Sequence, residues 1–184
     1  MIRVLDRDGV LLGTCGANLA AYSQASKEVG LSFDATALEE SIHGGESVSD
    51  FRVPVWGEIS EKEFAQVKKA KVGLFTQLLP LVQINPIWVD EILNSPGDFY
   101  LATKASIEST HFLIQQLIPE FRISHIFSTQ VPQYSSKVEI LESISEFQNA
   151  SPCDLILYDD SPQTIQLVTG AGFQAELSPH FCGV

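Results

Sequence analysis

The sequence has few basic residues, few cysteines and no long hydrophobic run. Its 11 Lys and Arg stand against 23 Asp and Glu, a net charge of −12, and they form no basic stripe that would follow a phosphate backbone. Binding to nucleic acid is therefore disfavoured. The same acidity repels a phosphorylated small molecule at long range, so an anionic substrate needs local cations, a metal ion or helix N-termini.

The scarcity of cysteine argues against a disulfide framework and against a structural zinc site. Cys15, Cys153 and Cys182 are far apart and form no CxxC pair or Cys/His cluster, so free thiols in a reducing compartment are expected. No apolar run is long enough to span a membrane, and Asp6 and Asp8 interrupt the N-terminus before a secretory hydrophobic region develops. We expect a cytoplasmic protein that binds no membrane.

The composition is that of a folded protein, with 45% hydrophobic and 18% charged residues among 184, and no repeat is visible. This length fits one domain, or one core domain with a modest insertion. Short apolar segments at 2–5, 99–102, 126–127, 155–158 and 173–177 are expected strands, and the last four alternate with expected helices at 106–118, 136–147 and 162–169. This alternation predicts an α/β fold, a parallel sheet with helices on both faces.

The stretch between the first two strands has a different pattern. Helical spacing is expected over 18–29, 34–42, 60–79 and 85–93, with a looser segment around 51–57. Ser60 and Glu63 match a capping box, and Asn85 followed by Pro86 matches an N-cap with proline in the first turn. We therefore expect an α/β core at 1–13 and 96–184, and a helical insertion at 14–95.

Asp6 and Asp8 follow the first strand and are themselves followed by Gly9. Two carboxylates at the end of a buried strand are costly unless a cation lies between them, and their alternate spacing lets both face one ion or one phosphate group. The alternative is an Asp-rich turn before a glycine, which is a common way to end a strand. This segment alone leaves both interpretations open.

Other chemically useful residues follow the other expected strands. Thr103 and Lys104 follow one, Asp159 and Asp160 follow another, and Lys137 begins a helix. In an open parallel sheet, ligands bind at the carboxyl ends of the strands, so these residues are expected at one edge together with Asp6 and Asp8. Each also has a plainer interpretation: a strand-terminal threonine, a solvated lysine, and a turn that caps the next helix.

The order of these segments resembles the haloacid dehalogenase superfamily of hydrolases, most closely the branch of phosphoglycolate phosphatase and beta-phosphoglucomutase. The matching motifs are Asp6-Arg7-Asp8-Gly9-Val10-Leu11, Tyr100-Leu101-Ala102-Thr103, Lys137, and Asp159-Asp160-Ser161-Pro162. The resemblance covers nearly the whole chain, and it implies a Rossmann-like core with a helical cap inserted after the first strand.

The resemblance also implies roles for the motif residues. Asp6 is the nucleophile that forms an aspartyl-phosphate, and Asp8 protonates the leaving alcohol and then deprotonates water. Thr103 and Lys137 stabilise the phosphoryl group. The expected substrate contacts are Gly9, Thr103, Lys104 and Lys137, and the expected ligands of Mg²⁺ are Asp6, the Asp8 carbonyl and Asp160, with Asp159 nearby.

The resulting prediction is a Mg²⁺-dependent phosphatase that acts on a small phosphorylated metabolite, as a monomer or homodimer. A sugar phosphomutase and a non-catalytic binding protein of the same fold are the alternatives. Thr164 and Val138 depart from the family pattern, which has an acid or Asn at the first position and a proline at the second. Candidates in the insertion for contacting substrate are His43, Gly44, Gly45, Arg52, Trp56 and Lys71.

Overall fold

The computed structural model describes residues 1–43, 50–95, 97–119 and 123–182, and the chain divides into two compact units. Unit 1 contains Met1–Leu12 and Ile84–Phe181, and unit 2 contains Gly13–Gln83 and Cys182. The chain passes between the units at strands β2 (Leu12–Gly13) and β3 (Gln83–Ile84), which pair with each other. Within the described ranges, none of the helices combines the length and apolar character that crossing a membrane requires.

Unit 1 is built on a five-stranded sheet in the order β5-β4-β1-β6-β7. Its strands are β1 (Ile2–Leu5), β4 (Phe99–Thr103), β5 (His125–Ser128), β6 (Leu155–Asp159) and β7 (Gln174–Leu177). All four pairings are parallel, and β1 lies at the centre with Leu5 opposite Leu101 on one side and Tyr158 on the other. The predicted parallel sheet is confirmed.

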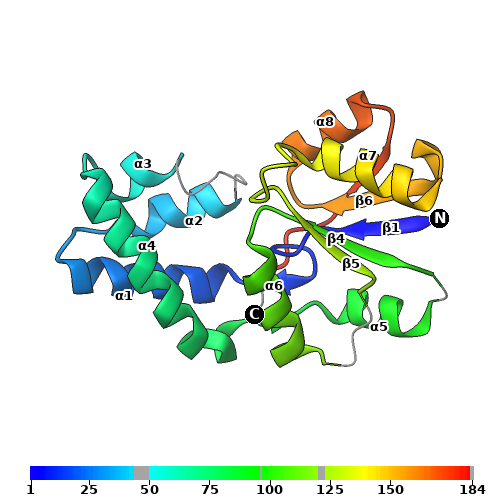
Figure 1. The fold of residues 1–184 in the computed structure, drawn as a ribbon. Coiled ribbons are helices and arrows are strands. Elements are labelled where there is room, and N and C mark those ends of the chain that lie inside the picture. Colours follow the sequence, from blue (N-terminus) through cyan, green and yellow to red (C-terminus); the bar gives the residue numbers. More distant parts are fainter. Residues whose placement is uncertain (44–49, 96, 120–122, 183–184) are drawn as a thin grey trace. The chain divides into compact units, whose positions relative to one another are not determined.

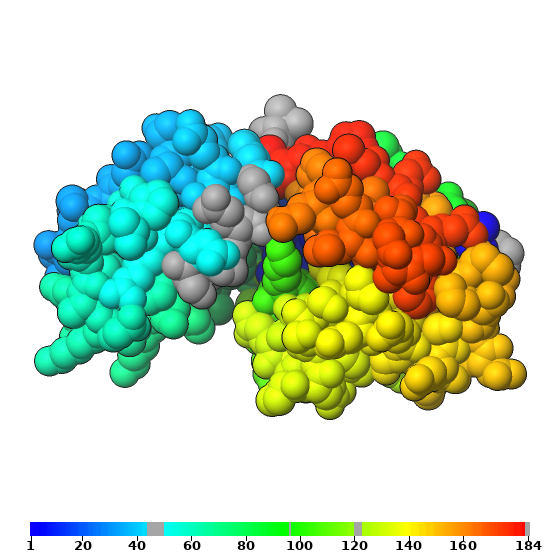
Figure 2. All heavy atoms as spheres, turned by 90° about the horizontal axis from the view of Figure 1, so that it is seen from above, coloured from blue at the N-terminus to red at the C-terminus, as the bar shows by residue number. Residues whose placement is uncertain are grey.

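Helices flank both faces of this sheet (Figure 1). Helices α7 (Lys137–Gln148) and α8 (Pro162–Gly170) cover one face, and α5 (Pro86–Asn94) and α6 (Ile107–Leu117) lie on the other. A short 3₁₀ helix, η2 (Pro152–Asp154), precedes β6. Figure 2 shows α7 and α8 next to each other on the outer surface of unit 1. Helix α5, which we expected in the insertion, belongs to unit 1.

Serine side chains start the helices that follow β4, β5 and β6. The hydroxyls of Ser106, Ser136 and Ser161 accept hydrogen bonds from backbone N–H groups three residues later, at 3.1, 3.3 and 3.3 Å. Such caps satisfy N–H groups that have no partner inside the helix. They fix where α6, α7 and α8 begin, and so fix the position of Lys137, the first residue of α7.

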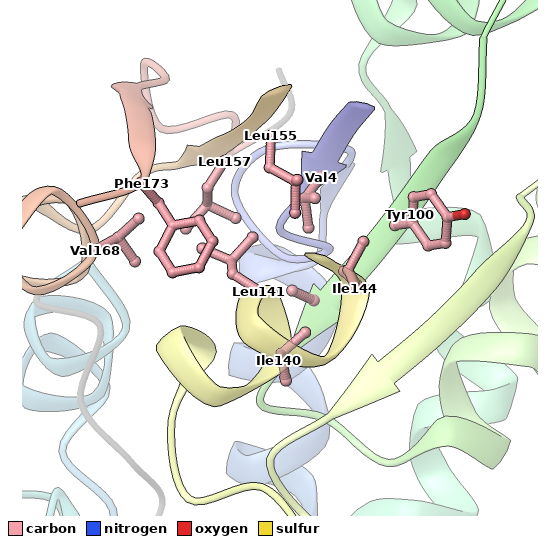
Figure 3. Packing of buried hydrophobic residues seen from close by; sticks show 10 residues of the cluster. Val4, Tyr100, Ile140, Leu141, Ile144, Leu155, Leu157, Val168 and Phe173 are labelled. Carbon is pink, nitrogen blue, oxygen red and sulfur yellow. The ribbon is translucent and has the colours of Figure 1, made fainter. Parts of the chain in front are cut away.

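A hydrophobic cluster joins the sheet to α7 and α8 (Figure 3). Ile140, Leu141 and Ile144 of α7 and Val168 of α8 are fully buried against side chains from three strands. The strand side chains are Val4, Tyr100, Ala102, Leu155 and Leu157, and Phe173 completes the cluster. Because burial of apolar surface is the main stabilising contribution, this cluster holds the ends of β1, β4 and β6 in register beside α7.

Unit 2 is helical. It contains α1 (Cys15–Val29), α2 (Ala35–His43), α3 (Arg52–Trp56), α4 (Glu61–Phe75) and the 3₁₀ helix η1 (Thr76–Leu81). Its core includes Trp56, whose Nε1–H donates to Ser26 Oγ at 2.6 Å. The expected capping box of Ser60 and Glu63 is present. Two expectations differ. The looser segment contains α3, and the helix expected to reach residue 79 becomes 3₁₀ from Thr76, in a segment that contains Pro80.

Candidate functional site

The ends of β1, β4 and β6 bring Asp6, Thr103 and Asp159 to one edge of the sheet. These strands are adjacent and parallel, so their carboxyl ends point the same way. The backbone N–H of Asp6 donates to the Tyr158 carbonyl oxygen at 2.9 Å, which continues the pairing of β1 with β6 past Leu5. All three side chains are buried. Two buried carboxylates at this edge require positive charge nearby.

Lys137 supplies that positive charge. Its Nζ donates to Asp6 Oδ1 at 2.6 Å and to Asp159 Oδ2 at 2.5 Å. The lysine is only 7% exposed, so it is not the solvated helix-start residue of the plainer interpretation. An ammonium group between two carboxylates recovers part of the desolvation cost of all three charges. The structure therefore links the first, third and fourth sequence motifs through one side chain.

Burial and charge change the pKa values of this cluster. Burial raises the pKa of the Asp6 carboxyl to about 7, and the Lys137 ammonium opposes this effect. Burial by itself lowers the pKa of the Lys137 amine, but Asp6 and Asp159 outweigh burial and raise that pKa above its ordinary value. Lys137 is therefore a cation at neutral pH, whereas full ionisation of Asp6 requires further positive charge beside it.

The carboxylates of Asp6, Asp159 and Asp160 form a potential site for such a charge. Each offers one oxygen, and these oxygens all lie within 4.8 Å of one another. Mg²⁺ prefers a few carboxylate oxygens and completes its octahedron with water and phosphate oxygens. A divalent cation here would also favour the ionised form of Asp6. The residues present therefore fit a magnesium ion.

Asp160 contacts His180, to which the sequence pattern assigned no function. His180 Nδ1 and Asp160 Oδ2 form a hydrogen bond, which raises the pKa of the His180 imidazole although burial opposes it. His180 comes three residues after Leu177, the last residue of β7. Its position just past the carboxyl end of a strand was the one available sequence signal, and it is the same signal that identified Asp6, Thr103 and Asp159.

Asp8 has a partner that the sequence pattern did not indicate. The guanidinium of Arg7 donates to Asp8 from Nε at 3.1 Å and from Nη2 at 2.5 Å. Nη1 of Arg7 also donates to Ser109 Oγ at 3.2 Å and to Thr110 Oγ1 at 3.0 Å on α6. Arg7 is buried and joins the turn after β1 to α6. This arrangement holds the Asp8 carboxylate on Arg7, close enough to Asp6 for its charge to contribute to the raised pKa of Asp6.

Gly9 lies in a tight turn between β1 and β2. Its N–H donates to the Leu12 carbonyl oxygen at 2.8 Å, and its φ is +80°. A Cβ at this position would lie 2.7 Å from His180 Nδ1 and still closer to Asp160 Oδ2. Glycine is therefore required here both by the backbone conformation and by the approach of these two side chains.

The remaining motif residues lie near this edge. Thr103 ends β4, and its Oγ1 accepts a hydrogen bond from the Ala105 N–H at 3.1 Å. Lys104 is exposed, and its carbonyl oxygen accepts from Gln130 Nε2 at 2.9 Å. Thr164, which stands where the family pattern has an acid or Asn, is buried in the first turn of α8. The predicted phosphate contacts of Thr103 and Lys104 stay predictions.

The candidates in unit 2 have structural partners within that unit. Trp56 packs in its core, and Arg52 pairs with Glu61 and stacks on Phe64. Lys71 Nζ lies 4.3 Å from the centre of the Phe75 ring, and His43 Nε2 lies 3.4 Å from Cys182 Sγ. Gly44 and Gly45 lie outside the described residues. Packing in this core accounts for the burial of Trp56.

Three solved structures show what this fold is similar to. A haloacid dehalogenase-like family hydrolase from Streptococcus pneumoniae has a TM-score of 0.77 at 17% identity, over 95% of this chain and 82% of that one. CbbY from Rhodobacter sphaeroides, in complex with phosphate, has a TM-score of 0.76 at 20% identity, over 98% and 87%. A predicted phosphoglycolate phosphatase from Haemophilus somnus has a TM-score of 0.75 at 13% identity, over 100% and 88%.

Comparison by sequence finds less: no family model and no curated protein matches the chain. The similarity to the solved structures therefore lies in the arrangement of helices and strands along almost the full length of the chain.

Proposed function

We propose that this chain, which has the fold of the haloacid dehalogenase-like hydrolases, is a Mg²⁺-dependent phosphatase that hydrolyses a small phosphomonoester through an aspartyl-phosphate. The strongest support is the Lys137 ammonium, which lies between Asp6 and Asp159 at the carboxyl edge of the sheet. Such an edge brings together a nucleophile, a fixed cation and metal-binding acids. Phosphoryl transfer needs these groups because its transition state spreads negative charge over three oxygens.

Asp6 is the proposed nucleophile. One of its carboxylate oxygens attacks phosphorus in line with the leaving oxygen, so that a P–O bond to Asp6 forms as the P–O bond to the alcohol breaks. Lys137 stays charged throughout and neutralises both Asp6 and the phosphoryl oxygens. We also assign donors of hydrogen bonds to the same oxygens: the Thr103 hydroxyl, the turn at Gly9 and Lys104.

Asp8 is the proposed proton carrier. It gives a proton to the leaving alkoxide, and in the second step it takes a proton from the water that attacks the aspartyl-phosphate. The attack releases inorganic phosphate and restores the Asp6 carboxylate. Arg7 donates to both oxygens of Asp8 in this structure, so the role requires one of these bonds to give way to the leaving oxygen.

Magnesium would be held by the Asp6 carboxylate, the Asp8 carbonyl oxygen and Asp160, with Asp159 beside them. When bound, it neutralises the charge of the phosphoryl group and keeps Asp6 ionised. Unit 2 is inserted in the chain at the point where the family has its helical cap. We therefore assign substrate selection to unit 2.

Phosphate release from a broad panel of phosphomonoesters tests the proposal. Purified protein with MgCl₂ is expected to release phosphate, and EDTA is expected to abolish the release. Asp6→Asn removes the nucleophile and should lower turnover by at least about 10⁴-fold. Asp90→Asn is the matched control, because Asp90 is an exposed residue of α5 outside the motif residues, and it should leave turnover unchanged.

The same assay separates the phosphatase from its alternatives. Steady release of phosphate supports hydrolysis, whereas a requirement for a bisphosphorylated activator without net release identifies a phosphomutase. Absence of turnover with every ester, or full turnover by Asp6→Asn, would contradict the proposal.

A further inference from the structure

Two backbone hydrogen bonds join the segment that follows β7 to the candidate site. The Ser178 N–H donates to the Asp159 carbonyl oxygen at 2.9 Å, and the Phe181 N–H donates to the Gly9 carbonyl oxygen at 2.7 Å. These bonds join the segment to the turn after β1 and to the end of β6, which carry the candidate nucleophile and the candidate metal ligands. His180 lies between the two attachment points.

This attachment places the His180 imidazole on Asp160. Nδ1 of His180 bonds to Oδ2 of Asp160, and the two side chains are only 24% and 14% exposed. Gly9 lies against the same pair so closely that a Cβ there would overlap both side chains. Packing and hydrogen bonding therefore confine the His180 and Asp160 side chains to one arrangement.

The other two clustered acids are also fixed by hydrogen bonds. Lys137 holds Asp6 and Asp159, and the Ser161 N–H donates to Asp159 Oδ1 at 2.9 Å. In these contacts Lys137 does not bond to Asp160. Asp160 is bonded to His180 instead. A carboxylate bonded through one oxygen keeps the other oxygen directed, and such outer partners of metal ligands contribute strongly to metal affinity.

We propose that His180 is a positioning residue for metal binding: it fixes Asp160 so that this carboxylate is preorganised to bind the divalent cation. The proposal rests on the proposed function in that it takes Asp160 as a ligand of Mg²⁺. It adds to that site a residue from the segment after β7, outside the four sequence motifs.

Titration with MgCl₂ alone tests this role without any substrate. The dissociation constant is measured by calorimetry on the full chain and checked by the Mg²⁺-dependent rise in melting temperature. His180→Ala is expected to weaken Mg²⁺ binding about tenfold or more. His180→Asn places an amide N–H near the position of Nδ1, and its Mg²⁺ affinity should be within about threefold of that of the wild-type protein. His111→Ala, at an exposed position on α6, is the matched control and should not change affinity.

The outcomes separate this proposal from the function itself. Unchanged or tighter Mg²⁺ binding by His180→Ala overturns the positioning role, as does an equal loss in the Ala and Asn variants, which would indicate packing alone. If the unchanged protein does not bind Mg²⁺, the proposed function fails and the positioning role fails with it. Melting temperatures in EDTA show whether each variant is folded.

Discussion

At the scale of single residues, Gly9 shows how tightly the candidate site is packed. It has a positive φ of +80°, as several other glycines do, but a side chain at Gly9 would also meet Asp160 and His180. Gly172 has a φ of +90°, and among the described residues no atom outside its own turn lies within 4 Å of the point that a Cβ would occupy. An alanine at Gly172 would therefore have the backbone strain without the crowding.

These two glycines allow a matched prediction. Gly172→Ala should lower the free energy of unfolding by about 1 kcal/mol, the cost of a left-handed alanine. Gly9→Ala should cost about 2 kcal/mol or more, because Asp160 or His180 must also move, and it should weaken Mg²⁺ binding. Urea unfolding in EDTA and a MgCl₂ titration measure the two effects. Equal losses of stability with unchanged Mg²⁺ binding would show that the crowding has no consequence.

The motif residues could be predicted to share one edge because they follow parallel strands, and the structure brings Asp6, Lys137 and Asp159 into contact. The side-chain partners of Asp8 and Asp160 could not be predicted: His180 also follows a strand, but nothing in the sequence pairs it with Asp160. Arg7 reaches Ser109 and Thr110 on α6, about a hundred residues away, and no spacing rule relates these positions. Side-chain partners of this kind depend on tertiary packing.

At the scale of elements, α1 carries a tyrosine whose ring is buried among aromatic side chains. Tyr22 lies edge-on to Phe51 at 5.8 Å and to Trp56 at 5.6 Å between ring centres. Burial raises the pKa of the Tyr22 hydroxyl from 10.0 to about 12. The phenol therefore stays neutral in the folded unit at a pH where it ionises in the unfolded chain.

This difference predicts alkaline instability of unit 2. Because the folded pKa is the higher one, the contribution of neutral Tyr22 is complete below pH 10 and is lost as pH rises toward about 12. The expected slope from this residue is at most about 1.4 kcal/mol per pH unit. The free energy of unfolding, measured in urea at several pH values in this range, should fall less steeply with rising pH for Tyr22→Phe than for the wild-type protein. A variant that loses stability as steeply as the unchanged protein would exclude Tyr22 as the cause.

Several helix starts were predictable because their signals are local. Ser60 with Glu63, Asn85 with Pro86, and Ser136 each cap a helix at the expected position. The five-residue helix Arg52–Trp56 was not predicted, because it contains Pro54 and is too short for a helical period. The pairing of Leu12–Gly13 with Gln83–Ile84 was not predicted either, since two-residue strands carry no alternation.

At the scale of the whole molecule, the chain is two compact units, each with its own buried cluster. The three clustered acids and Lys137 all belong to unit 1. A ligand that binds only the folded form stabilises the unit that holds its site.

Calorimetry is therefore expected to show two unfolding transitions, and MgCl₂ is expected to raise the melting temperature of only one of them. At a Mg²⁺ concentration about a hundred times the dissociation constant, the stabilisation of unit 1 should be about 2.7 kcal/mol. Asp160→Asn should reduce this shift and leave the other transition in place. Equal movement of both transitions would mean that the units unfold together.

The position of β1 in the sheet has a consequence for folding during synthesis. β1 precedes the other strands of this sheet in chain order and lies at its centre, but its neighbours β4 and β6 begin only at Phe99 and Leu155. All helices of unit 2 leave the ribosome before either neighbour does. The strand that leads to the candidate nucleophile therefore stays unpaired until these later segments have been translated. The long sequence separation of the pairings also favours slow assembly of the sheet.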